Sequence, residues 1–208
     1  MRTIFLIFFL ATTFVVAGQK RLSEGSMTFS VINLKAGKPE GDTLSSIHYF
    51  KGAHLRTDLI AKLGNSVTIY DTRETKGAII RDFGAQKILI PLDETAWQDR
   101  NSWFANSVIE FLEQEQLLLG YTCKKAKLTM VNGAAIEVMY TSEVKLENTN
   151  TEFQFGDLPG LVLSYTYTKG DMTVIYKPVS LNFDPVPIQK FDIPNSGYRL
   201  LDYKESKK

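Results

Sequence analysis

Alternation of apolar and polar residues dominates the first half of the chain. The segment Met27–Val31 alternates strictly, and short apolar runs follow at 46–50, 54–60, 67–70, 78–80 and 88–90. Turn residues such as Gly, Asn and Pro separate these runs. A period of two is typical of a β-strand with one buried face, so this half of the chain is predicted to be a series of short strands.

The period changes near the middle of the chain. Starting from Phe104, apolar residues fall at i, i+4, i+7 and i+8, with polar residues in between. Polar residues just before this segment are candidate N-caps, and Gly120 is a candidate stop. The spacing therefore predicts one amphipathic helix over roughly 102–118.

Strand patterns resume after Gly120, over 121–130, 135–144, 161–168 and 172–176. The connections are short, and Asn132-Gly133 is a strong hairpin signal, so neighbouring strands are predicted to pair antiparallel. A sheet of about ten or eleven strands has to curl, close or split. We therefore predict an α+β fold, in which residues 19–208 form a single domain: a strongly curved antiparallel sheet, or half-open β-barrel, with one main helix against its concave face.

The first eighteen residues have the pattern of an export signal. Arg2 provides the positive charge, residues 4–16 form an apolar stretch, and Ala17-Gly18 provides small residues for cleavage. A transmembrane anchor is the alternative, but the stretch is shorter than the roughly 20 apolar residues that a span needs. We predict that residues 1–18 are a cleaved signal peptide and that the mature chain has no transmembrane segment. The predicted location is the periplasm, with the extracellular space as the alternative.

Charge and composition exclude several classes of function. The chain has 24 Lys and Arg against 23 Asp and Glu, which leaves no basic surplus for nucleic-acid binding. One cysteine cannot form an internal disulfide, and two histidines with one cysteine are too few for a structural zinc site. Asp82-Phe83-Gly84 spells a kinase tripeptide but lacks the accompanying kinase motifs. We predict a protein that is not an enzyme, with no catalytic residue, cofactor or metal.

Three side chains leave alternatives open. His48 and His54 could face each other across a turn, although ordinary sheet positions are favoured for both. Two neighbouring lysines could lower the pKa of the Cys123 thiol and make it reactive, which would indicate a redox protein. The favoured alternative is that Cys123 is a small buried residue on a strand.

A resemblance to a known family rests on residues 156–163, which read Gly-Asp-Leu-Pro-Gly-Leu-Val-Leu. This segment resembles the motif of the exported GLPGLI-type families of unknown function, which in turn resemble the periplasmic lipoprotein carriers and receptors of the LolA/LolB type. The segments 27–29, 120–126 and 191–198 fit the resemblance in order. The resemblance implies a half-open barrel with a helix at its mouth, and a cavity that receives the acyl chains of lipoproteins.

The predicted cavity lies between the helix and the strand that begins at Leu161. Strict alternation would place four residues of that strand on one face, opposite the apolar face of the helix. The residues expected to line the cavity are Trp103, Phe104, Val108, Phe111, Leu161, Leu163, Tyr165 and Tyr167. The same residues could instead form the core of a filled barrel.

Two functions follow from these two alternatives. The first is an exported, non-enzymatic binding or carrier protein for a lipid, an acyl chain or a lipoprotein. The second is an envelope protein-interaction or sensor module with a filled barrel and no small ligand. A chain with so little net charge lacks the means to hold anionic membranes by charge, so any lipid would have to enter an apolar cavity.

Overall fold

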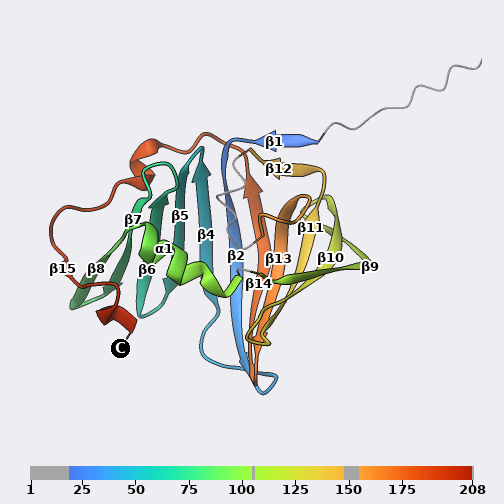
Figure 1. Ribbon diagram of the computed structural model, residues 1–208, viewed down its shortest axis with the longest axis horizontal. Helices are drawn as coiled ribbons and strands as arrows, with labels where there is room; N and C mark the ends of the chain where they lie inside the picture. The colour runs from blue at the N-terminus through green and yellow to red at the C-terminus, as the bar shows by residue number, and fades with distance from the viewer. Residues whose placement is uncertain (1–18, 105, 148–154, 208) are drawn as a thin grey trace, which may run out of the picture.

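The computed structural model describes residues 19–104, 106–147 and 155–207 (Figure 1). The predicted signal peptide, residues 1–18, lies outside the described residues. The strands of the described part are β1 (Lys20–Leu22), β2 (Glu24–Lys35), β3 (Lys38–Pro39), β4 (Leu44–Lys51), β5 (His54–Ala61), β6 (Gly64–Asp71), β7 (Lys76–Phe83), β8 (Gln86–Leu92), β9 (Val108–Leu118), β10 (Tyr121–Thr129), β11 (Ala135–Thr141), β12 (Val144–Leu146), β13 (Leu161–Lys169), β14 (Met172–Asn182) and β15 (Arg199–Leu200). The helical elements are α1 (Glu94–Asn101) and the 3-10 turns η1 (Ser102–Phe104), η3 (Ile188–Phe191) and η4 (Glu205–Lys207).

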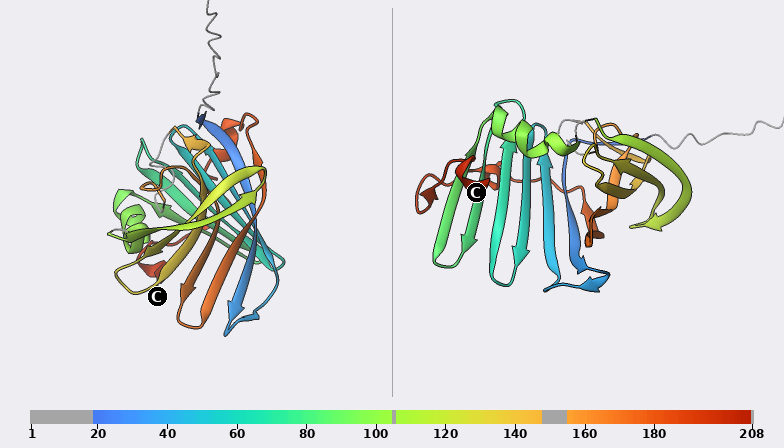
Figure 2. Two further views of the ribbon diagram at one scale, coloured as in Figure 1. Left: turned by 90° about the vertical axis from the view of Figure 1, so that its right-hand side faces the viewer. Right: turned by 60° about the horizontal axis from the view of Figure 1, so that its bottom comes forward.

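One 13-stranded sheet forms most of the molecule, in the order β15-β8-β7-β6-β5-β4-β2-β14-β13-β11-β10-β9, with β3 beside β2. The sheet is not closed, because β15 and β9 stand at opposite ends of this order. The two views of Figure 2 show that it curls strongly at the β9 end. The prediction of a large curved antiparallel sheet with one α-helix is therefore confirmed for the described residues, with more strands than the ten or eleven expected.

Two pairings depart from the antiparallel pattern. β15 pairs in parallel with β8 at one end of the large sheet. β1 pairs in parallel with β12 and forms a separate two-stranded sheet. Both involve short strands near the ends of the described chain, which have no alternating pattern long enough to be seen in the sequence.

The position of the helix was predicted wrongly. The α-helix α1 covers Glu94–Asn101, and most of the segment predicted as helical forms the strand β9, Val108–Leu118. Asp93 is the N-cap of α1, and its carboxylate accepts a hydrogen bond of 2.8 Å from the backbone N–H of Ala96. The helix is short and mostly exposed, so its apolar pattern is too weak to recognise.

Pairing with β10 explains why residues 108–118 form a strand. Leu119 and Gly120 both have positive φ, 50° and 85°, and they join Leu118 to its partner Tyr121 in a two-residue hairpin. This is the geometry of a tight hairpin turn, so Gly120 turns the chain between strands rather than ending a helix. The Glu, Gln and Leu residues of the segment favour a helix by propensity, but hairpin pairing overrides this weak preference.

Each face of the sheet from β4 to β8 is covered by a different segment. The face that carries α1, called here the inner face, buries Tyr70, Ile79, Ile90 and Leu92 against the helix. On the opposite, outer face, the segment after β14 packs against the sheet through Val186 and Phe191. Because both faces are covered, these strands bury apolar residues on both sides rather than on alternate positions alone.

The curled half of the sheet has its own core. Side chains from β10, β11 and β13 pack together with Phe155 and Leu158, which come from the turn before β13. A register shift between Met139 and Tyr140 places Tyr140 opposite Val162 but Met139 opposite Ser164. This β-bulge interrupts strict alternation along β13, so its residues do not divide between two faces as the sequence predicted.

Candidate functional site

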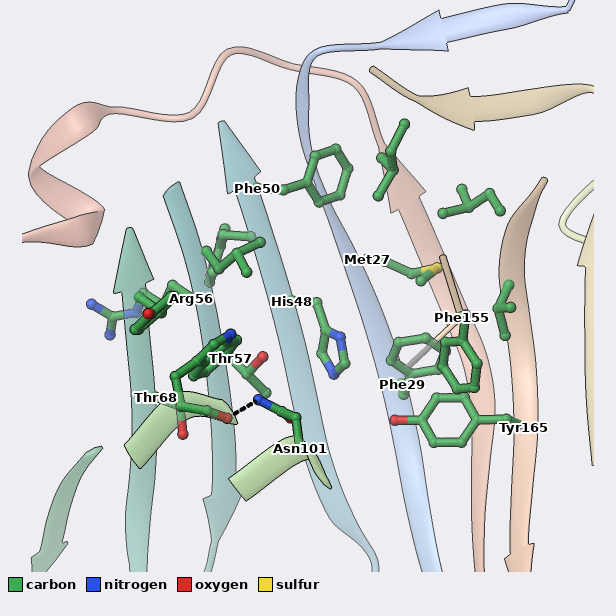
Figure 3. A pocket seen from close by; sticks show the side chains of 17 residues that line it. Met27, Phe29, His48, Phe50, Arg56, Thr57, Thr68, Asn101, Phe155 and Tyr165 are labelled. Carbon is green, nitrogen blue, oxygen red and sulfur yellow. Dashed lines mark hydrogen bonds between the residues drawn. The ribbon is translucent and has the colours of Figure 1, made fainter. Parts of the chain in front are cut away.

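A pocket of about 140 Å³ opens on the inner face of the sheet, beside the C-terminal end of α1 (Figure 3). Its lining residues come from β2, β4, β5, β6 and β12, from α1, and from the region 155–165 around the start of β13. The pocket therefore lies where the flat half of the sheet, the helix and the curled half meet.

The floor of the pocket is a row of three polar side chains on neighbouring strands. His48 of β4 is paired with Thr57 of β5, which is in turn paired with Thr68 of β6. All three line the pocket (Figure 3). They present hydroxyl and imidazole groups, which can donate or accept hydrogen bonds without carrying a charge.

The same row becomes apolar on both sides of the pocket. Beyond Thr68, it continues with Ile79 and Ile90, which are buried beneath α1. Beyond His48, it continues with Met27 of β2. Polar side chains are unusual on a covered sheet face, so their position there calls for an explanation. Here all three polar side chains of the row line the pocket.

One wall of the pocket belongs to α1. The ring of Trp97 stacks on that of Tyr70, with centroids 4.0 Å apart and planes 6° apart, and this contact holds the helix against β6. Asn101, at the end of the helix, is buried and donates a hydrogen bond of 2.7 Å from its side-chain amide to the carbonyl of Trp97. Both residues line the pocket, so the position of α1 sets its width on this side.

The opposite wall is an aromatic cluster. The ring of Tyr165 lies 5.7 Å from that of Phe29 and 5.2 Å from that of Phe155, and it stacks on Tyr176 at 4.1 Å. Burial raises the pKa of the Tyr165 hydroxyl well above its usual range, so this group stays neutral. The wall is therefore apolar and uncharged.

His48 is also uncharged at neutral pH. Its ring lies edge-on to Phe29 at a centroid distance of 5.1 Å, and its Nε2 is 3.0 Å from the hydroxyl of Ser46. Protein surrounds the imidazole, although part of its surface faces the pocket, and this burial lowers its pKa to about 4. Protonation would place an unpaired cation in the pocket.

Among the described lining residues, Arg56 has a cationic side chain, but its guanidinium is bound to groups outside the pocket. Its Nε donates to Asp58 at 2.5 Å, and its Nη1 donates to the carbonyl of Lys190 at 2.7 Å. The guanidinium points away from His48 and Thr57 in Figure 3. The pocket thus presents largely apolar walls, one of which carries the Asn101 amide, and a neutral polar floor.

Seven of the eight residues predicted to line a cavity are distributed over three environments. Leu161 and Tyr165 line the pocket. Leu163 is fully buried, and Phe104 and Tyr167 pack against the core of the curled half. Val108 and Phe111 are 70% and 57% exposed on β9. The side chain of Trp103 lies outside the described part of the structure.

The pocket residues that sequence reasoning missed include the polar floor, the α1 wall and two rings of the aromatic wall, Phe29 and Phe155. Thr57 stands between Leu55 and Leu59 on one face of β5, so a polar residue interrupts an otherwise apolar alternation. This interruption is a signal that the sequence contains. No comparable signal marks Trp97, because it lies in a short, mostly exposed helix that has no clear apolar period.

The remaining candidate side chains occupy structural positions. Cys123 is fully buried, and burial raises the pKa of its thiol to about 11, which opposes formation of a reactive thiolate. His54 Nδ1 lies 3.0 Å from Asp71 Oδ2 rather than near His48. Among the described residues, no group of three or more His, Cys, Asp or Glu side chains could hold a metal ion.

Comparison with protein families gives one match, to the model described as N-glycanase peptide, N-terminal domain. It matches residues 87–180. The match runs from β8 to β14, less than half of the chain, and so includes the α1 wall and the aromatic residues of β13 but not the polar floor. A search among curated proteins finds no match.

Two solved structures share the fold, and a third gives a weaker match. The structure of PNGF-II is 18% identical over 88% of this chain, with a TM-score of 0.51, and the alignment covers 32% of PNGF-II. An uncharacterized conserved protein from Thermus thermophilus is 11% identical over 85% of this chain and 90% of its own, with a TM-score of 0.52. A β-barrel-like protein of the domain of unknown function DUF1849 from Brucella abortus is 8% identical over 80% of this chain and 100% of its own, with a TM-score of 0.40.

These likenesses describe the fold and leave activity open. The chain spans about a third of the length of PNGF-II. The Thermus thermophilus protein, in contrast, is covered almost completely, so this fold also occurs as nearly the whole of a chain. Within the described residues, no helix is long and apolar enough to cross a membrane.

Proposed function

We propose that this chain is an exported, non-enzymatic binding protein whose inner-face pocket receives an uncharged, largely apolar group. The observation that carries the proposal is the coincidence of the polar floor, His48, Thr57 and Thr68, with an apolar pocket at the end of α1. Pockets that bind small molecules combine apolar walls with a few polar groups that fix orientation.

The size of the pocket limits its occupant. At about 140 Å³, it is comparable with apolar cavities of roughly 150 Å³ that bind benzene. A whole acyl chain would need the pocket to enlarge, for instance by movement of α1. We therefore propose that the pocket takes the end of an acyl chain of a lipid or lipoprotein, or a ring of similar size.

Export and the carrier role belong to the same proposal. The charged and apolar pattern of residues 1–18 supports cleavage as a signal peptide and a periplasmic location for residues 19–208. The unclosed curved sheet with a helix on its inner face is compatible with the resemblance to LolA/LolB-type carriers.

Binding of benzyl alcohol to the purified chain tests the pocket. This probe combines a ring with one neutral hydroxyl, and we expect it to shift the amide NMR signals of residues around His48 and Thr57. Benzoate should bind more weakly, because no cationic group of the described lining is available to pair with its carboxylate: Arg56 is already paired with Asp58. Mass spectrometry of a solvent extract of the natively purified protein would show whether an acyl-bearing lipid is retained.

Filling the pocket provides the control. Thr57→Phe places a ring on the pocket floor and should abolish the shifts caused by benzyl alcohol. Thr28→Phe is the matched variant, because Thr28 lies on β2 between two lining residues but outside the pocket. Equal binding by the two folded variants, or no binding by the wild-type chain, would contradict the proposed function.

A protein-interaction module is the second candidate function. It is favoured by the large apolar side chains that β9 exposes outside the pocket, at Val108, Phe111 and Leu117. This candidate does not require the pocket to be occupied.

A further inference from the structure

β9 is a long strand with one unpaired edge. It contains 11 residues and pairs with β10, and within the described ranges it is the last strand of the sheet. Figure 1 shows it at the end of the curled half, opposite β8. An unpaired edge presents a row of free backbone N–H and C=O groups, which can pair with another extended chain.

At the other end of the sheet, the edge of β8 is covered by another segment of the chain. There β15 adds its two residues, Arg199 and Leu200, to β8, and the backbone N–H of Leu201 continues the contact by donating to Leu89. The chain thus covers its β8 edge with its own C-terminal segment. The described chain provides no equivalent cover for β9.

On one face of the sheet, a row of alternating charges runs across three strands and ends at β9. Glu110 of β9 is paired with Lys127 of β10, which is paired with Glu137 of β11. Glu115 lies 4.0 Å from Lys124 but on the opposite face, because Lys124 is paired with Tyr140 whereas Lys127 is paired with Glu137. The row through Glu110 ends at the free edge with an acidic residue. Opposite charges on directly paired residues stabilise a sheet, so the next strand would continue the alternation with Lys or Arg.

The other face of β9 is apolar in the part of the strand before the register shift at Lys124/Lys125. Ile109 and Phe111 lie opposite the buried residues Leu128 and Ala126 of β10. Phe111 makes an edge-on contact with Tyr140, at a centroid distance of 6.1 Å, yet 57% of its surface remains exposed because no strand lies beyond it. An added strand with apolar residues on this face would cover it.

We propose that the β9 edge binds an extended segment of a partner protein by strand addition, and that this segment alternates basic and apolar residues. A basic side chain of the segment would lie beside Glu110, and its apolar side chains would lie beside Ile109 and Phe111 on the other face. Backbone pairing provides affinity in this mode of recognition, and alternate side chains provide specificity. The inference rests on the second candidate function and is independent of any ligand in the pocket.

A second copy of this chain fits the edge less well. β9 carries three glutamates and no basic residue, so two copies of β9 could not place opposite charges beside each other. Like charges on directly paired residues destabilise a sheet. The charge pattern therefore favours a basic partner over self-association.

A synthetic nine-residue peptide of alternating lysine and valine tests the proposal. At low ionic strength we expect it to bind and to slow hydrogen exchange at the amides of residues 108–118. The variant Glu110→Gln should bind the peptide about two- to fivefold more weakly, because one cross-strand charge pair is lost. The matched variant Glu74→Gln, with the same net charge, should bind like the wild type.

Two further peptides separate strand addition from attraction by charge alone. A glutamate–valine peptide should not bind, and neither should a lysine–valine peptide with every backbone amide N-methylated. Equal binding of the N-methylated peptide, or protection confined to other strands, would overturn the proposal. Slow exchange at β9 without peptide, together with dimers in sedimentation, would overturn it in favour of a second copy.

Discussion

Gly160 stands where the chain enters β13, and the space around it admits no side chain. An ideal Cβ at this position would lie 1.9 Å from the carbonyl oxygen of Thr141. The φ of Gly160 is not positive, so the constraint is close backbone approach and not the left-handed turn that its Leu-Pro-Gly context suggests. The motif at 156–163 thus closes the turn tightly against β11.

Gly160→Ala is therefore expected to destabilise the fold by about 3 kcal/mol, because the backbone of two strands must separate. Gly170, at the other end of β13, is the matched control. It has φ +61° and open space around it, so Gly170→Ala should cost only about 1 kcal/mol of backbone strain. Urea denaturation measures both variants, and equal losses would contradict the close-approach argument.

His48 makes stability depend on pH in a defined window. Its pKa falls from 6.5 to about 4 in the folded chain, so the unfolded chain binds a proton first as the pH decreases. The stability associated with neutral His48 is complete above pH 6.5 and is lost as the pH falls towards 4. The loss should reach about 2–3 kcal/mol.

His48→Gln removes the titrating group while keeping a neutral hydrogen-bonding side chain. Comparing urea denaturation of the wild type and this variant at several pH values isolates the contribution of His48, because other carboxyl groups titrate in both proteins. The difference in unfolding free energy should change between pH 6.5 and 4 and stay constant above 6.5. A constant difference throughout would show that His48 is not buried as described.

At the scale of elements, the sequence is informative where period and turn chemistry agree. Asn132-Gly133 joins β10 to β11 and Gly170 joins β13 to β14, in antiparallel pairs as predicted. The segment 108–118 shows the limit. Its apolar residues fit a helical period, but the deciding feature is the turn at Leu119-Gly120, where leucine adopts a positive φ that is unusual for it.

The candidate site was predictable only in part for the same reason. Leu161 and Tyr165 belong to a clearly apolar strand and were predicted to line a cavity, and they line this pocket. The floor residues His48 and Thr57 come together only through the register of β4 and β5, and that register depends on pairing across the sheet. A short helix whose burial rests largely on Ala96 and Trp97 adds the remaining wall, and local sequence does not encode where it packs.

At the scale of the whole molecule, the segment after β14 joins the two faces of the sheet. It packs on the outer face through Val186 and Phe191, pairs with β8 at the edge, and reaches the α1 side through Leu201 and Tyr203. It ends with an ion pair between Lys207 and Asp99 of α1. One continuous segment thus holds both layers and covers the β8 edge.

Deleting residues 199–208 should therefore have two effects. The cluster beneath α1 loses Leu201 and Tyr203, so the unfolding free energy should fall by about 2–3 kcal/mol. The edge of β8 becomes free, so the protein should associate in a concentration-dependent way that light scattering detects. Lys207→Ala is the control, because it breaks an exposed ion pair but keeps the strand, and should change both measurements little. A truncated chain that stays monomeric with unchanged urea denaturation would show that this segment neither protects the edge nor holds the helix.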